Sequence, residues 1–347
     1  MKIKKILLLW SQLADYSVAS LRKLSENKDV ELYIIHRKND PNAPYEGFDL
    51  SFFKKEVYFE KENEKELYDF CVTLNPDIII MASWNYSFYM SVARQCKKAG
   101  TYVVSTFDGQ WLGTPKQRLG ILSSPFFLKP AIDNFFVPGD RQASFARKLG
   151  YKSPFIGYYS ANTERFCNVQ PLGSSSNKFI FVGRLVSVKG IDCLMSAYKK
   201  YRKEVNNPWN LVICGKGELQ HLVENQEGVE IHGFTQPAQL PERLAGAKCL
   251  ILPSVFEPWG LVVHEAALAG LAIISSYASG ASTYFVRDGQ NGFIVNPDEE
   301  SLLRAMKDVS QLSEERFNEM SATSKLLGSL WTTEKWARYV YENICNR

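Results

Sequence analysis

Short apolar runs alternate with helical periods twice along the chain, and this repeated alternation restricts the fold more than any single motif. Such alternation is typical of parallel sheets with helices on both faces, so we expect an α/β protein with two doubly wound, Rossmann-like lobes. The predicted strands of the first set lie near residues 3–10, 30–36, 77–82, 102–106 and 134–138, with helices near 12–25, 61–74, 86–99 and 140–149. Those of the second set lie near 178–183, 210–214, 229–232, 249–253, 271–275 and 292–295, with helices between them.

The length of 347 residues also favours two domains. A polar stretch that contains Gly-Ser-Ser-Ser separates the two sets, and we interpret residues 168–177 as a linker. The predicted lobes are then residues 1–167 and 178–330. A last helix within residues 331–347 carries apolar side chains at helical spacing.

Two carboxylates follow the apolar run of residues 249–254 in a pattern that suits a diphosphate ligand. Glu257 lies in a predicted loop, and Glu265 lies on a helix that is predicted to begin near Gly260. The start of a helix offers unpaired amides and a positive dipole end, which attract phosphate. A sugar on one side of a diphosphate and a ribose on the other could each meet one carboxylate. The alternative is an acidic loop residue favoured by the macrodipole and one solvated helix residue.

A second element precedes the glutamates by about 70 residues. The strand predicted at 178–183 runs into Gly183 and Arg184, and Lys189 follows before the next helix. Both basic residues would lie at the carboxyl end of the strand, where open α/β sheets bind ligands. A forked guanidinium and a compact ammonium suit a diphosphate without a metal. The alternative is a pair of solvated loop residues.

These motifs together give the segment 178–300 a resemblance to a known family. It resembles the donor half of the retaining GT-B glycosyltransferases, in particular glycosyltransferase family 4, also called glycosyl transferases group 1. The resemblance is strong over the C-terminal half and weak over the N-terminal half. It rests on residues 182–185, 189–190, 213–219, 232–234, 253–254, 269–270 and 286–293, together with the two spaced glutamates.

The resemblance implies a GT-B arrangement, with two lobes facing across a cleft and the last helix packed back on the first lobe. It implies that Arg184 and Lys189 hold the donor diphosphate, that Glu265 accepts the ribose hydroxyls, and that Glu257 is a catalytic residue at the donor sugar. The other positions that it assigns to donor binding are Gly183, Gly215, Phe234, Trp259, Gly260 and Leu261. Among these, Gly215 and Phe234 would line the base pocket, and Trp259 replaces the family's usual Phe.

The chain departs from the family at two places in the N-terminal half. The first predicted strand ends in Trp10 and Ser11 without the glycines of the family's first loop, and the same lack argues against a nicotinamide or flavin cofactor. After the strand at 102–106, Phe107 stands where many relatives have His, and Asp108 follows it. We predict Asp108 as a catalytic residue on the acceptor side. Its alternative is a turn residue before Gly109.

Composition excludes several other kinds of site. The seven cysteines are scattered without a CxxC pair and the four histidines do not cluster, so we expect a reducing cytoplasmic setting, no metal and no cofactor. The apolar run at residues 6–10 is short and is interpreted as a buried strand instead of a signal peptide. No run approaches the length of a membrane span.

Residues 110–130 combine aromatics with bases and contain no acid, which suits a lipid headgroup boundary at the inner face of a membrane. The alternative, slightly favoured, is a long loop that covers the core. Residues 1–170 hold 23 Lys and Arg against 18 Asp and Glu. This surplus is too small to indicate nucleic acid, but it could favour an anionic membrane or a diphosphate-lipid acceptor.

The sequence therefore predicts a glycosyltransferase of hexosyltransferase type. It would transfer a sugar with retention from a nucleotide-diphosphate sugar to a hydroxyl of a sugar on a lipid or on a growing surface polysaccharide. Two alternatives stay open, namely a same-fold nucleotide-sugar epimerase or phosphorylase and a non-catalytic nucleotide-sugar-binding subunit. The absent glycine loop and Phe107 are the features that favour the last.

Overall fold

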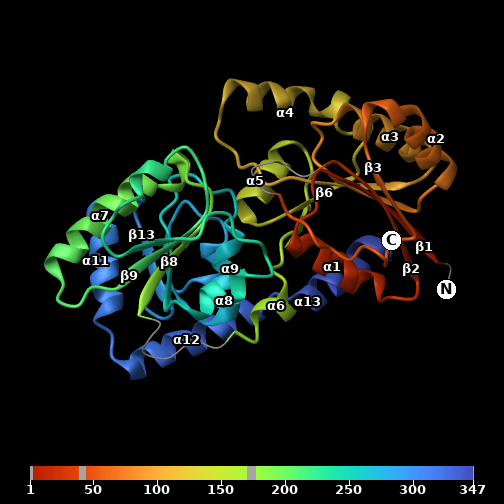
Figure 1. Ribbon diagram of the computed structural model, residues 1–347. Coiled ribbons are helices and arrows are strands. Elements are labelled where there is room, and N and C mark those ends of the chain that lie inside the picture. The colour runs from red at the N-terminus through yellow and green to blue at the C-terminus, as the bar shows by residue number, and fades with distance from the viewer. Residues whose placement is uncertain (1–2, 39–43, 170–176, 347) are drawn as a thin grey trace. The chain divides into compact units, whose positions relative to one another are not determined.

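The computed structural model describes residues 3–38, 44–169 and 177–346, and the chain forms two compact units (Figure 1). The first unit comprises Met1–Ser160 and Thr333–Arg347, and the second comprises Ala161–Thr332. Each unit is built on a parallel sheet with helices, which confirms the predicted doubly wound α/β class. Most of the proposed linker, residues 170–176, lies outside the described residues.

The first unit has a seven-stranded sheet in the order β3-β2-β1-β4-β5-β6-β7. The central strand β1 pairs in parallel with β2 and β4, and its residues 6–9 are fully buried because helices cover both faces. The two edge strands, β3 and β7, were not predicted from the sequence. The strands are β1 (Lys4–Trp10), β2 (Val30–His36), β3 (Lys55–Tyr58), β4 (Ile78–Ala82), β5 (Tyr102–Thr106), β6 (Asn134–Val137) and β7 (Phe155–Ile156).

The helices of the first unit include one from the C-terminal end of the chain. Helix α13 packs against α1, which confirms the prediction that the last helix returns to the first unit. Trp336 of α13 is buried, and its Nε1 donates a hydrogen bond to the carbonyl of Tyr158 at 2.8 Å. The helices are α1 (Asp15–Ser25), α2 (Glu64–Leu74), α3 (Ser87–Lys98), α4 (Pro115–Phe127), α5 (Asp140–Lys148) and α13 (Thr333–Val340), which continues into a π-helical turn at Tyr341–Cys345.

The favoured expectation of a long loop over residues 110–130 was wrong, because α4 occupies most of this stretch (Figure 1). Thr114 caps the helix by accepting a hydrogen bond from the amide of Gln117, and Pro115 takes the first helical position, where its missing N–H costs nothing. Pro125 lies inside the last turn. Because Gly120 and Pro125 are weak helix formers, no helix was predicted here from the sequence.

The second unit has a six-stranded sheet in the order β10-β9-β8-β11-β12-β13. The central strands β8 and β11 are apolar runs that are buried on both faces, as expected for a covered parallel sheet. The strands are β8 (Lys178–Val182), β9 (Asn210–Cys214), β10 (Val229–Ile231), β11 (Cys249–Leu252), β12 (Ala272–Ser276) and β13 (Gly292–Val295). The helices are α6 (Thr163–Phe166), α7 (Ile191–Glu204), α8 (Leu240–Ala245), α9 (Leu261–Ala269), α10 (Ser282–Phe285), α11 (Glu299–Ser310) and α12 (Glu314–Ser329).

The division between the units falls before the boundary predicted at residue 167, because residues 161–167 pack with the second unit. Helix α6 packs on α9. The buried His264 of α9 accepts a hydrogen bond from the amide of Ala161 at its Nδ1 (3.1 Å) and contacts the carbonyl of Gly328 through its Nε2 (2.9 Å). One side chain therefore ties together the segments by which the chain enters and leaves this unit.

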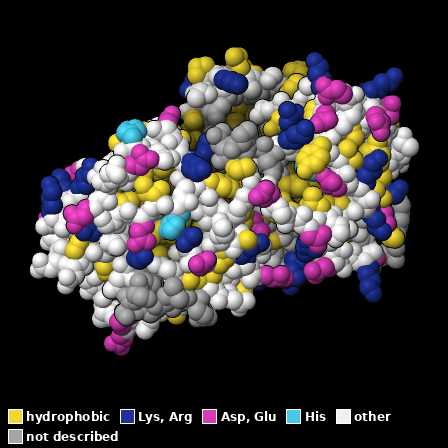
Figure 2. All heavy atoms as spheres, in the orientation of Figure 1, with side chains coloured by type: hydrophobic (Ala, Val, Ile, Leu, Met, Phe, Trp, Pro, Cys, Tyr) yellow, Lys and Arg dark blue, Asp and Glu magenta, His cyan; other side chains and the backbone are white. Residues whose placement is uncertain are grey.

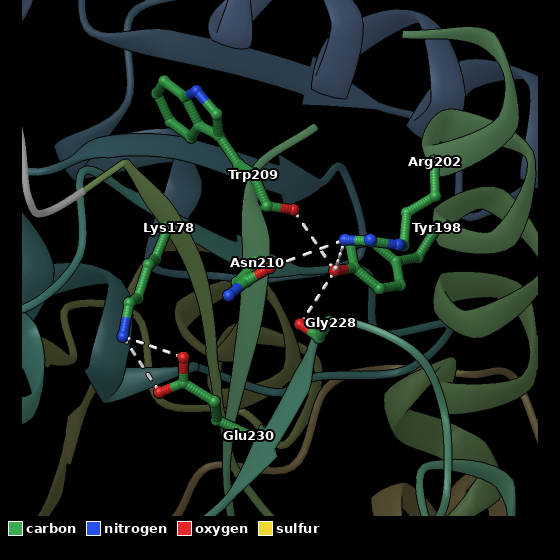
Figure 3. A network of polar contacts seen from close by, with 7 residues as sticks. All are labelled: Lys178, Tyr198, Arg202, Trp209, Asn210, Gly228 and Glu230. Carbon is green, nitrogen blue, oxygen red and sulfur yellow. Dashed lines mark hydrogen bonds and ion pairs between the residues drawn. The ribbon is translucent and has the colours of Figure 1, made fainter. Parts of the chain in front are cut away.

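Polar side chains near the amino ends of the strands in the second sheet bond mainly to one another (Figure 3). The ammonium of Lys178 contacts both carboxylate oxygens of Glu230, at 2.8 and 2.9 Å. The hydroxyl of Tyr198 lies 2.9 Å from the carbonyl of Gly228 and 3.2 Å from that of Trp209, either of which can accept its proton, and Arg202 donates to that hydroxyl. This network fastens α7 to the sheet. We assign it a structural role, since most of its polar groups bond within the second unit.

Candidate functional site

The loops that follow β8 and β9 run in close backbone contact at the carboxyl edge of the second sheet. The amide of Gly183 donates to the carbonyl of Cys214 at 3.0 Å, and the amide of Leu185 donates to that of Lys216 at 2.8 Å. A Cβ atom at Gly215 would lie 1.8 Å from the carbonyl oxygen of Gly183. Glycine at 215 is therefore required by backbone packing, and its part in a base pocket stays a prediction.

Arg184 is held at this edge by the same pair of loops. Its side chain is exposed, and within the described residues it makes no hydrogen bond or ion pair. A guanidinium that is fixed at its backbone and unpaired at its tip is available to an anionic ligand.

The loop after β8 also packs against the loop after β11, and this contact joins Lys189 to Glu257. Gly190 adopts a left-handed conformation with φ 70°, and a Cβ there would lie 2.3 Å from the carbonyl oxygen of Pro253. The Lys189 ammonium donates a hydrogen bond to Oε2 of Glu257. The two side chains are only 17% and 10% exposed, so the ion pair is largely withdrawn from water. The structure thus brings together two residues that were predicted to meet different parts of a ligand.

The start of α9 supplies hydrogen-bond donors next to this pair. Gly260 precedes the helix with φ 87°, and a Cβ there would lie 3.0 Å from the Cγ atom of Glu257. The side chain of Trp259 is buried and packs beside Tyr284, with ring centroids 5.4 Å apart. In the described part of the chain, the amides of Leu261 and Val262 have no hydrogen-bond partner. Two such donors at the positive end of a helix form an anion site.

The two other predicted donor-site residues lie on neighbouring elements of the same unit. Glu265 is half-buried on α9, about one turn beyond the free amides. Phe234 is half-buried in the loop that follows β10. Their roles toward ribose and base stay predictions.

Asp108 belongs to the first unit, where it follows β5 as predicted. Its carboxylate is exposed and accepts a hydrogen bond from the Tyr159 hydroxyl at 3.4 Å, while its carbonyl accepts one from Gln142 at 3.0 Å. The preceding Phe107 points into the core, because it packs edge-on against Phe135 with centroids 5.0 Å apart. The position where the family resemblance led us to expect His is therefore filled by a core side chain.

A cluster of tyrosines that was not predicted from the sequence lies beside Asp108. The ring of Tyr159 lies 5.1 Å from that of Tyr16 and 4.6 Å from that of Tyr158. Burial, with contributions from neighbouring tyrosines and Asp108, raises the pKa of Tyr16 and Tyr159 well above the ordinary value. Burial also raises the pKa of Tyr158 to about 12. The phenols therefore stay protonated at neutral pH and can donate hydrogen bonds. The adjacent pair at 158–159 was the available sequence signal.

The fold agrees with comparisons to solved structures of known proteins. The chain is similar to a glycosyltransferase from Rickettsia africae, with a TM-score of 0.76, 13% identity, and 98% of this chain and 97% of the other covered. It is also similar to Anabaena HepE, solved with UDP and glucose, with a TM-score of 0.74, 14% identity, and 99% and 100% of the two chains covered. These likenesses identify the fold as GT-B.

The sequence comparisons match part of the chain to one family. The profile described as glycosyl transferases group 1 matches residues 162–325. Alpha-maltose-1-phosphate synthase of Mycobacterium tuberculosis is 31% identical over 157 residues, which are 41% of this chain and 39% of that protein. The chain spans less than half the length of the first curated relatives it matches. The match to the glycosyl transferases group 1 profile covers just under half of the chain and contains the motifs from which the resemblance to this family was predicted.

Proposed function

We propose that this protein transfers a sugar, with retention of the anomeric configuration, from a nucleotide-diphosphate sugar to an acceptor hydroxyl. One observation carries the proposal. At the carboxyl edge of the second sheet, the unpaired Arg184, the Lys189–Glu257 ion pair and the free amides of Leu261 and Val262 come from the loops that follow β8 and β11. Positive charge and unused donors at that edge suit a diphosphate.

The proposed reaction uses these groups to stabilise the leaving nucleotide. The acceptor oxygen attacks the anomeric carbon from the face that the nucleotide leaves, and the bond from that carbon to the phosphate oxygen breaks with its electron pair going to the phosphate. The proton of the acceptor hydroxyl passes to the departing phosphate oxygen. Arg184, Lys189 and the helix amides balance the charge that develops there.

The glutamates take separate roles in this proposal. Glu257, next to Lys189, orients the donor sugar and keeps the ammonium in place, so that it is not a covalent nucleophile of the kind used by retaining hydrolases. Glu265, further along α9, accepts hydrogen bonds from the ribose hydroxyls.

On the acceptor side, Asp108 of the first unit accepts a hydrogen bond from the attacking hydroxyl. The acceptor is a sugar on a lipid or on a growing surface polysaccharide. One relative, 28% identical over 271 residues, is an exopolysaccharide phosphotransferase of Streptomyces coelicolor, which supports polysaccharide as the acceptor class to test first.

The test combines donor binding with turnover. A panel of nucleotide-sugars is screened by thermal shift, beginning with UDP-glucose, because HepE of the same fold is solved in complex with it. Arg184→Ala is expected to weaken binding of the preferred nucleoside diphosphate by about 1.5–3 kcal/mol, the value of a charge-assisted hydrogen bond. Arg304→Ala, which removes an exposed arginine from α11, is the matched control. Wild-type affinity in Arg184→Ala would overturn the donor-site assignment.

A non-catalytic nucleotide-sugar-binding subunit is the second candidate. It is favoured by the burial of Phe107 in the aromatic core at the position of the relatives' histidine. In that case the protein would bind a nucleotide-sugar but neither hydrolyse it nor transfer its sugar to any acceptor pool. Turnover of the nucleotide-sugar without any acceptor would instead indicate an epimerase or phosphorylase.

A further inference from the structure

Helix α4 presents an apolar stripe to solvent. Leu119, Leu122 and Phe126 are 66%, 73% and 85% exposed. Their spacing of three and four residues places them one above the other on a single side of the helix. An exposed leucine is ordinary on a protein surface, but three large apolar side chains in a row indicate a surface that something covers.

The opposite side of α4 anchors the helix to its own unit. The buried hydroxyl of Ser124 donates to the carbonyl of Leu149 at 2.7 Å, and the side chain of Gln117 donates to the carbonyl of Gln110 at 2.8 Å. Ile121, between these two contacts, and the buried Leu128, after them, lie on the same side and pack against the core. Because this inner side is fixed, the stripe cannot turn inward to join the core.

The charges around the stripe are of one sign. Lys116 and Arg118 are exposed and flank it, one on each side of the helix. Residues 109–132 contain these two bases and Lys129, and no Asp or Glu. Figure 2 shows hydrophobic and basic side chains together at the top of the view, where Figure 1 places α4. A helix with an apolar side bordered only by bases is typical of one that lies in a membrane interface and contacts anionic lipids.

We propose that α4 docks this protein on an anionic membrane surface. Leu119, Leu122 and Phe126 enter the boundary between headgroups and acyl chains, and Lys116 and Arg118 meet the lipid phosphates. The contact is interfacial, since none of the described helices is long and apolar enough to cross a bilayer. This inference goes beyond sugar transfer, because it does not depend on which reaction the protein catalyses.

The test is flotation of the whole 347-residue chain with two kinds of vesicle. One kind is pure phosphatidylcholine, and the other also contains phosphatidylglycerol. The wild type is expected to float with the anionic vesicles, to float much less with the neutral ones, and to lose binding as salt is added. The combined variant Leu119→Ser, Leu122→Ser, Phe126→Ser is expected to reduce the fraction bound by about tenfold or more. The pair Lys116→Glu, Arg118→Glu is expected to abolish the preference for anionic lipid.

Two matched controls separate the stripe from general surface effects. Leu326→Ser removes a leucine that is 63% exposed on α12, and Lys203→Glu reverses an exposed lysine on α7. Both controls are expected to float like the wild type. Nucleotide binding, measured by thermal shift, is expected to be the same in all these variants. Flotation and nucleotide binding are thus separate measurements, and a failure of the transferase assignment would leave the flotation result unchanged.

Three outcomes would overturn the proposal. The first is a wild type that does not float with anionic vesicles, and the second is a triple serine variant that floats like the wild type. The third comes from sedimentation velocity without lipid. If the wild type self-associates and the triple variant is monomeric, the stripe is an interface between protein copies.

Discussion

Removal of one charge from the Lys189–Glu257 ion pair is expected to destabilise the second unit. Lys189→Met keeps the apolar stem and deletes the ammonium, which leaves the buried Glu257 carboxylate without its partner. Glu257→Gln deletes the other charge. Both positions lie in loops, but the pair is largely buried, so a purely local effect on ligand binding is not expected.

The magnitude follows from the geometry and burial of the pair. Unit charges in contact at about 3 Å attract by roughly 5–6 kcal/mol in an effective dielectric of about 20. The loss of hydration of both groups offsets part of this attraction. Because the side chains keep 17% and 10% of their exposure, we expect a coupling of about 2–3 kcal/mol, within the range of close charge pairs. A single variant that loses this much free energy of unfolding is expected to have a melting temperature of the second unit lower by about 5–10 °C.

The assay is scanning calorimetry of the full chain, which can follow the two units as separate transitions. The wild type, both single variants and the double variant Lys189→Met, Glu257→Gln form a cycle that isolates the coupling. Arg184→Met, at an exposed and unpaired neighbour, is expected to melt like the wild type. A coupling below about 0.5 kcal/mol would refute the reasoning, because additive effects would show that the pair contributes nothing.

Four further predictions concern single residues. Burial lowers the pKa of His264 to about 4, so the unfolded state takes up a proton first as the pH falls. The free energy of unfolding of the second unit should therefore fall by about 3 kcal/mol between about pH 6.5 and 4. Urea titrations of His264→Gln should lack this loss. Glu265→Ala should weaken calorimetrically measured binding of ribonucleoside diphosphates while sparing 2′,3′-dideoxy analogues, and equal losses would exclude a ribose contact. Asp108→Asn should slow sugar transfer about tenfold or more, about 1.4 kcal/mol of barrier, with unchanged donor affinity; a wild-type rate would remove Asp108 from the acceptor model. Gly215→Ala should destabilise the protein in thermal melts, because its Cβ would overlap the carbonyl of Gly183, and an unchanged melting temperature would contradict that packing.

The sheets could be predicted from the sequence because parallel strands buried on both faces read as continuous apolar runs. Strands β1 and β8 are such runs, and both were placed within a residue or so of their observed ends. The edge strands of the first sheet, β3 and β7, escaped detection because they are short and only partly buried. Strand β3 has two charged residues among its four, and β7 has only two residues. Short, half-exposed strands do not have enough residues to show the alternation of apolar and polar side chains by which a strand is recognised.

The candidate site was predictable where it depended on strand ends and was not where it depended on tertiary contact. The prediction that Arg184 and Lys189 follow β8 needed only the strand and its glycine turn. The pairing of Lys189 with Glu257 joins residues 68 apart and depends on how two loops pack. The contact of Tyr16 with Tyr159 joins still more distant parts of the chain. Local patterns carry no information on such pairs.

The return of α13 to the first unit has a consequence for how the protein is made. During synthesis the ribosome must complete all of the second unit before Trp336, which packs on the first, leaves the exit tunnel. Until then the first unit exposes the apolar surface around Phe136 and Tyr158 that α13 covers. The nascent first unit thus has a period of exposed apolar surface whose length is set by the translation time of the second. Slow codons within the second unit would prolong that period and favour aggregation.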